Sequence, residues 1–130
     1  MKAAAAMTRA SVVFVTAGSE EQAESIARAL VGERLAACAN IVSPIKSIYR
    51  WKDEVETDTE HLLIIKTRAN LVAKVAARVK ELHSYEVPEV IALPIIAGAK
   101  SYLDWVLGST TAPSAASESR RPTSRPRRKK

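Results

Sequence analysis

The sequence predicts an α+β domain whose elements follow the order β-α-β-β-α-β, with a short helix at the C-terminal end of the domain. Two observations support this order. Four short runs are rich in β-branched and aromatic residues, which favour strands, and two stretches between them repeat apolar residues at helical spacing. The strand runs are apolar almost throughout rather than alternating, which indicates a sheet that is covered on both faces.

The first strand and the first helix have clear signals. The run Ser11 to Thr16 predicts a buried strand, and a capping box follows it. In this box Ser19 accepts a hydrogen bond from an early amide group, and Gln22 reaches back to the start of the helix. The helix ends at Gly32 or runs a few residues further, and the sequence does not decide between the two. The apolar stripe of the helix consists of Ala23, Ile26, Ala27, Leu30 and Val31.

The middle of the chain predicts a long hairpin. Residues 40–51 form its first extended arm, in which Pro44 marks an edge, a bulge or a strand start because proline has no amide hydrogen. Residues 52–60 are predicted as a polar, acid-rich connector, and residues 61–67 as the third strand. An extended connector aligns its alternate acids on one side, and we interpret them as a solvated rim in preference to a cation site. These acids are Glu54, Glu56, Asp58 and Glu60.

The remaining elements complete the fold. Asn70 is placed to cap a second helix, residues 90–96 predict the fourth strand, and residues 102–107 predict a short helix that Gly108 stops. The complete order is that of a ferredoxin-like sandwich, an antiparallel sheet with both helices on one face. A single copy cannot cover the other apolar face, so we expect the domain to associate with itself.

The charge of the chain divides it into three parts. The formal net charge of the 130 residues is +6, and the segment from Ser109 to the end accounts for all of it, with seven basic residues against Glu118. We therefore predict a flexible N-terminus over residues 1–9, one folded domain over residues 10–108, and a disordered basic tail over residues 109–130. The tail is either a solvated extension or a non-specific contact for nucleic acid or acidic surfaces.

The cysteine content and the hydropathy favour a cytoplasmic protein. Cys38 is the one cysteine of the chain, so it cannot form an internal disulfide, and its small apolar neighbours predict a buried side chain. The apolar stretch at the start of the chain is too short for a secretory signal, and we find no apolar run long enough to span a bilayer.

Polar side chains gather where the second predicted helix gives way to the fourth strand. Pro88 forces the residue before it into an extended conformation, which places His83, Tyr85 and Glu89 at the mouth of a buried strand. On the residues alone, a hydrogen-bonded histidine at the helix end is favoured over a metal ligand at His83. One imidazole in a chain makes a poor metal site, unless a three-fold assembly brings several copies together.

Other polar and aromatic residues have more than one interpretation. Tyr49 and Trp51 share a strand face and are typical of packing or interface residues. Lys66 and Arg68 follow a buried strand and are candidates for anion binding or for an ion pair with Glu89. We find no phosphate-binding loop, nucleophile elbow or paired-histidine motif, so the sequence predicts that the protein is not an enzyme.

Five separated blocks in the chain resemble the CutA family, the divalent-cation tolerance proteins. The resemblance covers about residues 10 to 108 and implies a trimer of ferredoxin-like subunits, similar to the trimer of the PII signalling proteins. It also implies tolerance to copper and other divalent metals. The blocks are Glu33-Arg34-Leu35-Ala36-Ala37-Cys38-Ala39-Asn40-Ile41, Tyr49-Arg50-Trp51, Leu62-Leu63-Ile64-Ile65-Lys66-Thr67, His83-Ser84-Tyr85-Glu86-Val87-Pro88-Glu89 and Tyr102-Leu103-Asp104-Trp105.

The resemblance implies a metal site only in part. Some copper-binding members have a cysteine in the first strand and two adjacent histidines, whereas this chain has Val15 and the pair Leu82-His83. His83 alone matches, so we expect weak binding of Cu²⁺ or another divalent cation that folding does not require. The resulting hypothesis is a trimeric divalent-cation tolerance protein that takes part in the response to metal ions. Its predicted cleft residues are Tyr85, Glu89, Lys66, Trp51 and Tyr49.

The alternative hypothesis is a PII-like signalling or scaffold trimer that binds a small anion or a partner protein. In that case Lys66, Arg68 and the boundary between subunits would matter more than His83.

Overall fold

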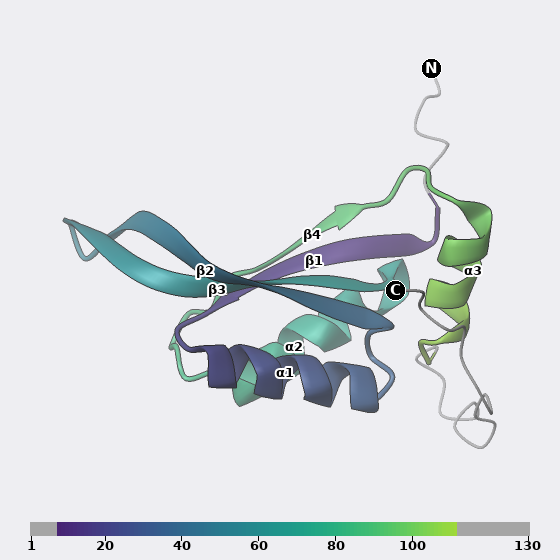
Figure 1. The fold of residues 1–130 in the computed structure, drawn as a ribbon, viewed down its shortest axis with the longest axis horizontal. Helices are drawn as coiled ribbons and strands as arrows, with labels where there is room; N and C mark the ends of the chain where they lie inside the picture. Colours follow the sequence, from purple (N-terminus) through teal and green to yellow (C-terminus); the bar gives the residue numbers. More distant parts are fainter. Residues whose placement is uncertain (1–7, 112–130) are drawn as a thin grey trace.

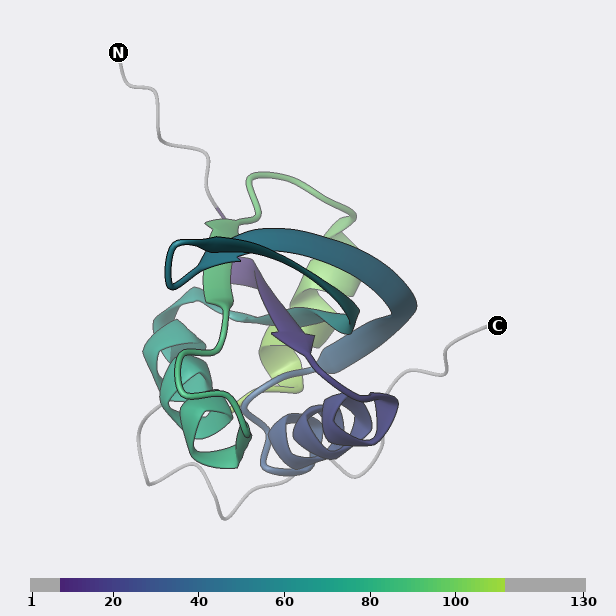
Figure 2. The same ribbon diagram turned by 90° about the vertical axis from the view of Figure 1, so that its left-hand side faces the viewer.

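A computed structural model describes residues 8–111 and confirms the α+β, ferredoxin-like order (Figure 1). Its four strands form one antiparallel sheet in the order β2-β3-β1-β4. Helices α1 and α2 lie side by side beneath this sheet, as Figure 2 shows from the end of the hairpin. The elements are β1 (Ala10–Ala17), α1 (Glu20–Gly32), β2 (Cys38–Trp51), β3 (Glu54–Arg68), the 3₁₀ turn η2 (Ala69–Leu71), α2 (Val72–Leu82), β4 (Val90–Pro94) and α3 (Lys100–Gly108).

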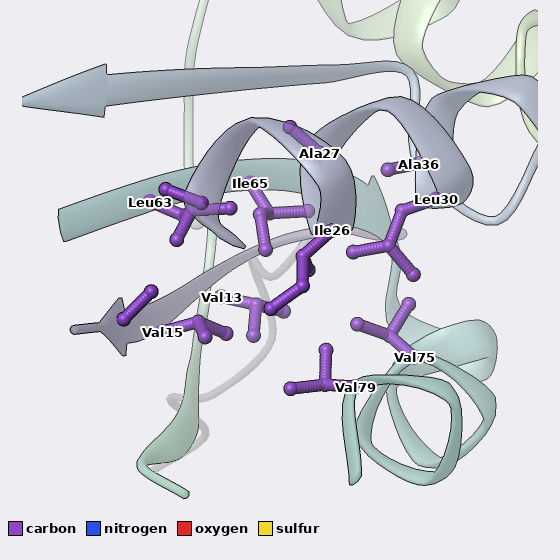
Figure 3. Close-up of a cluster of buried hydrophobic side chains, with 12 residues drawn as sticks. Val13, Val15, Ile26, Ala27, Leu30, Ala36, Leu63, Ile65, Val75 and Val79 are labelled. Atoms are coloured by element: carbon purple, nitrogen blue, oxygen red, sulfur yellow. The ribbon is translucent and has the colours of Figure 1, made fainter. Parts of the chain in front are cut away.

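The core lies between the two helices and the sheet (Figure 3). Alternate residues of the central strands β1 and β3 point toward the helices, because successive side chains of a strand face opposite sides. The predicted stripe of α1 packs on them and is fully buried at Ile26 and Leu30. The strand and helix residues that meet in this core include Val13, Val15, Ile26, Leu30, Leu63, Ile65, Val75 and Val79.

The start of α1 follows half of the predicted capping box. The Ser19 hydroxyl accepts a hydrogen bond from the amide of Gln22 at 3.1 Å, as predicted. The prediction for the Gln22 side chain is wrong, because its Oε1 accepts hydrogen bonds from the amide and the hydroxyl of Ser84 instead. Gln22 therefore ties the first turn of α1 to the loop that follows α2, and α1 ends at Gly32.

The long hairpin is present, but the predicted connector over residues 52–60 is wrong. Strand β3 begins at Glu54, so only Lys52 and Asp53 form the turn, both with positive φ (52° and 68°). Cross-strand pairing continues through the acidic stretch and joins Trp51 to Glu54 and Tyr49 to Glu56, which overrides the low strand propensity of the acids. The predicted role of Pro44 is confirmed, since the register of the edge strand β2 shifts between Val42 and Ile45.

Two further sequence predictions need correction. Asn70 does not cap α2, because the chain first passes through η2, and the residue before α2 is Leu71, which makes no capping bond with its side chain. Cys38 is partly exposed rather than buried, because it lies next to Asn40 on the outer strand β2, where it is paired only with β3.

One face of the sheet is apolar and is not covered by the helices. The strand register places Phe14 opposite both Ile64 and Ile91, and places Val12 opposite Leu93. Ile91 and Leu93 are 53% and 50% exposed, respectively. Within residues 8–111 this face therefore lacks the cover that the sequence predicts for it.

The ends of the described segment contact the domain. The amide of Thr8 donates to the carbonyl of Ile95 at 3.0 Å, and the amide of Thr111 donates to the carbonyl of Arg34 at 3.0 Å. Ordered contacts thus start before residue 10 and continue past residue 108. Most of the predicted N-terminal segment and most of the predicted basic tail lie outside the described residues. In the described part of the chain, each helix is too short or too polar to cross a membrane.

Candidate functional site

A groove of about 670 Å³ lies between the β2–β3 hairpin and the loop that joins α2 to β4. Its volume is within the range of pockets that bind small molecules. Most of its strand residues lie on the same side of the sheet as the open apolar face. On β3, Asp58 and Glu60 are separated from Leu62 and Ile64 by even numbers of residues, so their side chains point to the same side, and the lining residues of β2 are mostly paired with residues of that side. The lining residues are Thr16, Ser47, Ile48, Tyr49, Trp51, Asp58, Glu60, Tyr85, Glu86, Val87 and Glu89.

Four carboxylates face this groove, and none of its lining residues is basic. Asp58 and Glu60 are two residues apart on β3, while Glu86 and Glu89 come from the loop after α2. Across residues 8–111, none of these four acids forms an ion pair, although other acids of the domain do. Such an arrangement creates a negative potential that favours cations.

Two tyrosines hold the strand carboxylates in place. The Tyr85 hydroxyl donates to Oε2 of Glu60 at 2.9 Å, and the Tyr49 hydroxyl donates to Oδ2 of Asp58. Burial, followed by the hydrogen bond to Glu60, raises the pKa of Tyr85 to about 12. The hydrogen bond to Asp58 is the main reason that the pKa of Tyr49 rises to about 12. Both phenols therefore remain protonated donors at alkaline pH values at which a free tyrosine is already ionised.

The raised pKa of Tyr85 makes stability depend on alkaline pH. In the unfolded chain this phenol ionises near pH 10.0, but in the folded protein it ionises near pH 12. The unfolded state therefore loses its proton first, so the stabilisation is complete below pH 10 and is lost as the pH rises through about 12. We expect Tyr85→Phe to remove one phenol that titrates near pH 12 in tyrosinate absorbance. An unchanged titration curve near that pH in the variant would contradict this assignment.

Gly18 makes room for Tyr85 at the turn between β1 and α1. A Cβ atom at this position would lie only 2.8 Å from the Tyr85 hydroxyl oxygen, closer than van der Waals contact allows. The absence of a side chain thus lets the phenol reach Glu60 on β3. The sequence gives no sign of this role of Gly18, because the contact joins segments far apart in the chain and leaves no local pattern.

His83 directly follows the last residue of α2, and its side chain contacts the same loop. It is 9% exposed, and its ring centroid lies 4.6 Å from that of Tyr85. Nε2 donates to the carbonyl oxygen of Thr16 at 2.7 Å, since a carbonyl can only accept, and Nδ1 accepts from the amide of Tyr85 at 3.1 Å. These are the contacts of a hydrogen-bonded histidine at a helix end. Metal binding by His83 is not tested by them and stays a prediction.

The groove brings together Tyr49, Trp51, Tyr85 and Glu89, four of the five predicted cleft residues. Lys66 lies outside it, because it is six residues from Glu60 along β3, about 20 Å in a strand. Its ammonium group donates to Asn40 of β2 instead.

Arg68 is also remote from the groove and is engaged elsewhere. Its Nη2 donates to the carbonyl of Leu107 at 2.6 Å and its Nε to the hydroxyl of Thr110 at 3.0 Å, so it holds the end of α3. Burial and the nearby Arg9 lower the pKa of Arg68. Both cations proposed for anion binding are thus engaged in hydrogen bonds with other parts of the domain.

Comparison with known proteins identifies the family. A family profile described as CutA1 divalent ion tolerance protein matches residues 11–109. The chain belongs to this CutA family. It is 54% identical over 99 residues to the divalent-cation tolerance protein CutA of Thermus thermophilus, which covers 76% of this chain and 96% of that protein. It is also 48% identical over 99 residues to the chloroplastic CutA protein of Arabidopsis thaliana, covering 76% of this chain but only 54% of the longer relative.

Solved CutA structures share the fold. The crystal structure of CutA1 from Oryza sativa superposes with a TM-score of 0.78 at 46% sequence identity and covers 82% of this chain and 98% of that chain. This agreement supports the arrangement of strands and helices that builds the groove, and it confirms the family resemblance noted from the sequence blocks.

The described residues of this CutA chain do not form a complete metal site in a single copy. Among residues 8–111, no three His, Cys, Asp or Glu side chains lie close enough together to hold one. The groove carboxylates are spread along a strand and a loop, and both nitrogens of His83 are occupied by hydrogen bonds. One copy thus lacks the closed ligand set of a tight metal site.

Proposed function

We propose that this CutA chain forms a homotrimeric divalent-cation tolerance protein that binds ions such as Cu²⁺ weakly and takes part in the response to metal ions. The observation that carries the proposal is the groove of four carboxylates without a basic partner, in a chain of the CutA family. The role is one of binding rather than catalysis.

The open face of the sheet supports the trimer. Ile91 and Leu93 are about half exposed, next to Phe14 and Ile64 on the neighbouring strands. A contiguous apolar surface of this kind on a soluble domain is typical of an interface. In the proposed trimer the three sheets cover one another, and the three grooves lie beside the subunit boundaries.

The geometry of the groove explains why the proposed metal binding is weak. Scattered carboxylates attract a divalent cation through its hydration shell but do not replace that shell with a full set of ligands. For Cu²⁺ we propose His83 as the nitrogen ligand. Its Nδ1 would first have to release the amide of Tyr85, at a cost of about 0.5–1.5 kcal/mol for the lost hydrogen bond.

The other elements of the proposal follow the sequence. We propose a folded CutA domain over residues 10–108 and a cytoplasmic location. The PII-like alternative gains no support from the described residues, since Lys66 and Arg68 are engaged in other contacts.

Titration of Cu²⁺ into the full chain tests the metal-binding proposal. We expect weak, salt-sensitive binding that falls roughly tenfold, or about 1.4 kcal/mol, in the variant Glu86→Gln/Glu89→Gln. The matched control is Glu20→Gln/Glu21→Gln, which removes the same charge from exposed positions on α1. Equal weakening by the two variants would show that net charge, and not the groove, determines the affinity.

A further inference from the structure

Glu60 is the most buried of the four groove carboxylates. This carboxylate is only 7% exposed, and its single hydrogen bond within the described residues comes from the Tyr85 hydroxyl to Oε2. Its other oxygen, Oε1, has no hydrogen-bond partner and is not fully enclosed, since Trp105 Nε1 is the one fully enclosed side-chain polar atom without a partner in residues 8–111. Glu60 lines the groove, so we infer that Oε1 is accessible from it. A buried carboxylate without a cation is costly, so this site favours a positively charged ligand.

The groove also has aromatic and aliphatic walls that a hydrated metal ion would not use. Trp51 and Tyr49 stand on β2, and Ile48 and Val87 are among the more exposed apolar residues of the domain. The indole ring of Trp51 makes a cation–π contact with the neighbouring Lys52, whose ammonium nitrogen lies 5.8 Å from the centroid of the ring. Such rings attract organic ammonium ions through their negative faces.

The arrangement of the acids favours a linear ligand. Asp58 and Glu60 are on the same side of one strand. Their Cα atoms lie about 6.8 Å apart, which is the rise of two residues in a strand. Glu86 and Glu89 line the opposite wall from the loop after α2. Several separated carboxylates along an apolar channel match ammonium groups that are joined by short methylene chains.

We propose that the groove between the β2–β3 hairpin and the Tyr85–Glu89 loop binds a linear aliphatic di- or polyamine. The ammonium groups of the ligand lie on Asp58, Glu60 and the loop acids, and the methylene chains lie against Ile48, Trp51 and Val87. This proposal concerns the same groove as the proposed metal binding but does not depend on it, because it requires no closed set of metal ligands.

Calorimetric titration of the full chain with spermidine tests this proposal, with MgCl₂ at matched ionic strength as the comparison. We expect saturable spermidine binding that is roughly tenfold tighter than Mg²⁺ binding. Glu60→Gln is expected to weaken spermidine binding roughly tenfold, whereas Glu20→Gln leaves it unchanged. Spermidine is also expected to change the tryptophan fluorescence, and Trp51→Phe, which keeps an aromatic ring, should abolish that change.

Three outcomes would overturn the proposal. They are Mg²⁺ affinity equal to that of spermidine, an equal effect of the α1 and groove substitutions, and a fluorescence response that persists in Trp51→Phe. If Glu60→Gln does not fold, the exposed pair Glu86→Gln/Glu89→Gln decides the question, since these side chains support no other element. Cu²⁺ binding without spermidine binding would reject this inference alone, and spermidine binding without Cu²⁺ binding would reject only the proposed metal function.

Discussion

The double variant Ile91→Asp/Leu93→Asp is expected to be monomeric, whereas the unchanged chain is expected to be trimeric. Both side chains lie on the open face of β4 and are about half exposed in a single copy. In the proposed trimer that face becomes interior, where each aspartate would be a buried charge without a partner. Such a charge costs about 3–5 kcal/mol, and two per subunit exceed what a stable interface can tolerate. Light scattering coupled to gel filtration measures the mass directly.

The matched control for this experiment places the same charge on the other side of the domain. Ala73 is exposed near the start of α2, where an acid is favoured by the helix dipole, so Ala73→Asp is expected to keep the trimer. A monomer for the unchanged chain at micromolar concentration would reject the trimer outright. A trimer that survives both aspartates would move the interface to another surface.

The variant His83→Ala is expected to lose about 2–4 kcal/mol of folding stability. The substitution leaves the carbonyl of Thr16 and the amide of Tyr85 without their partners, and an unsatisfied buried polar group costs about 1–3 kcal/mol. It also removes the ring that packs against Tyr85 at 4.6 Å. Denaturant unfolding, monitored by circular dichroism, measures the loss.

A second variant separates this structural role from metal binding. His83→Gln can still donate and accept hydrogen bonds but has no imidazole, so it should recover part of the stability and lose the Cu²⁺ affinity that we propose for His83. Cu²⁺ binding that is the same in His83→Gln as in the unchanged chain would remove His83 from the metal site. Full stability in His83→Ala would show instead that its two hydrogen bonds contribute little.

The local signals of the chain predicted its elements well. The Ser19 cap, the apolar stripe of α1 and the register shift around Pro44 each depend on a few neighbouring residues, and the structure confirms all three. The bare apolar face was also predicted, because strands that are apolar on both sides require cover on both sides.

Two wrong predictions, the acidic connector and the role of Gln22, reflect competition between local preference and distant contacts. The acids from Glu54 to Glu60 read as a connector, yet pairing with β2 makes them a strand. Gln22 has the spacing of a capping box, yet its side-chain Oε1 accepts a hydrogen bond from Ser84, which is far away in the chain. Lys66 stays a prediction as a cleft residue, and its place six residues beyond Glu60 on β3 puts it outside the groove of a single copy.

The sequence by itself determined the order of the elements, the faces of the helices and the family, because these depend on periodicity and on short blocks of residues. Only the tertiary structure decided how the groove is made. It showed that Tyr85 crosses over Gly18 to reach Glu60, and that His83 holds the loop from which Tyr85 projects. These contacts join residues 18, 60 and 83–85, and no local pattern encodes a distance between segments that meet only when the chain has folded.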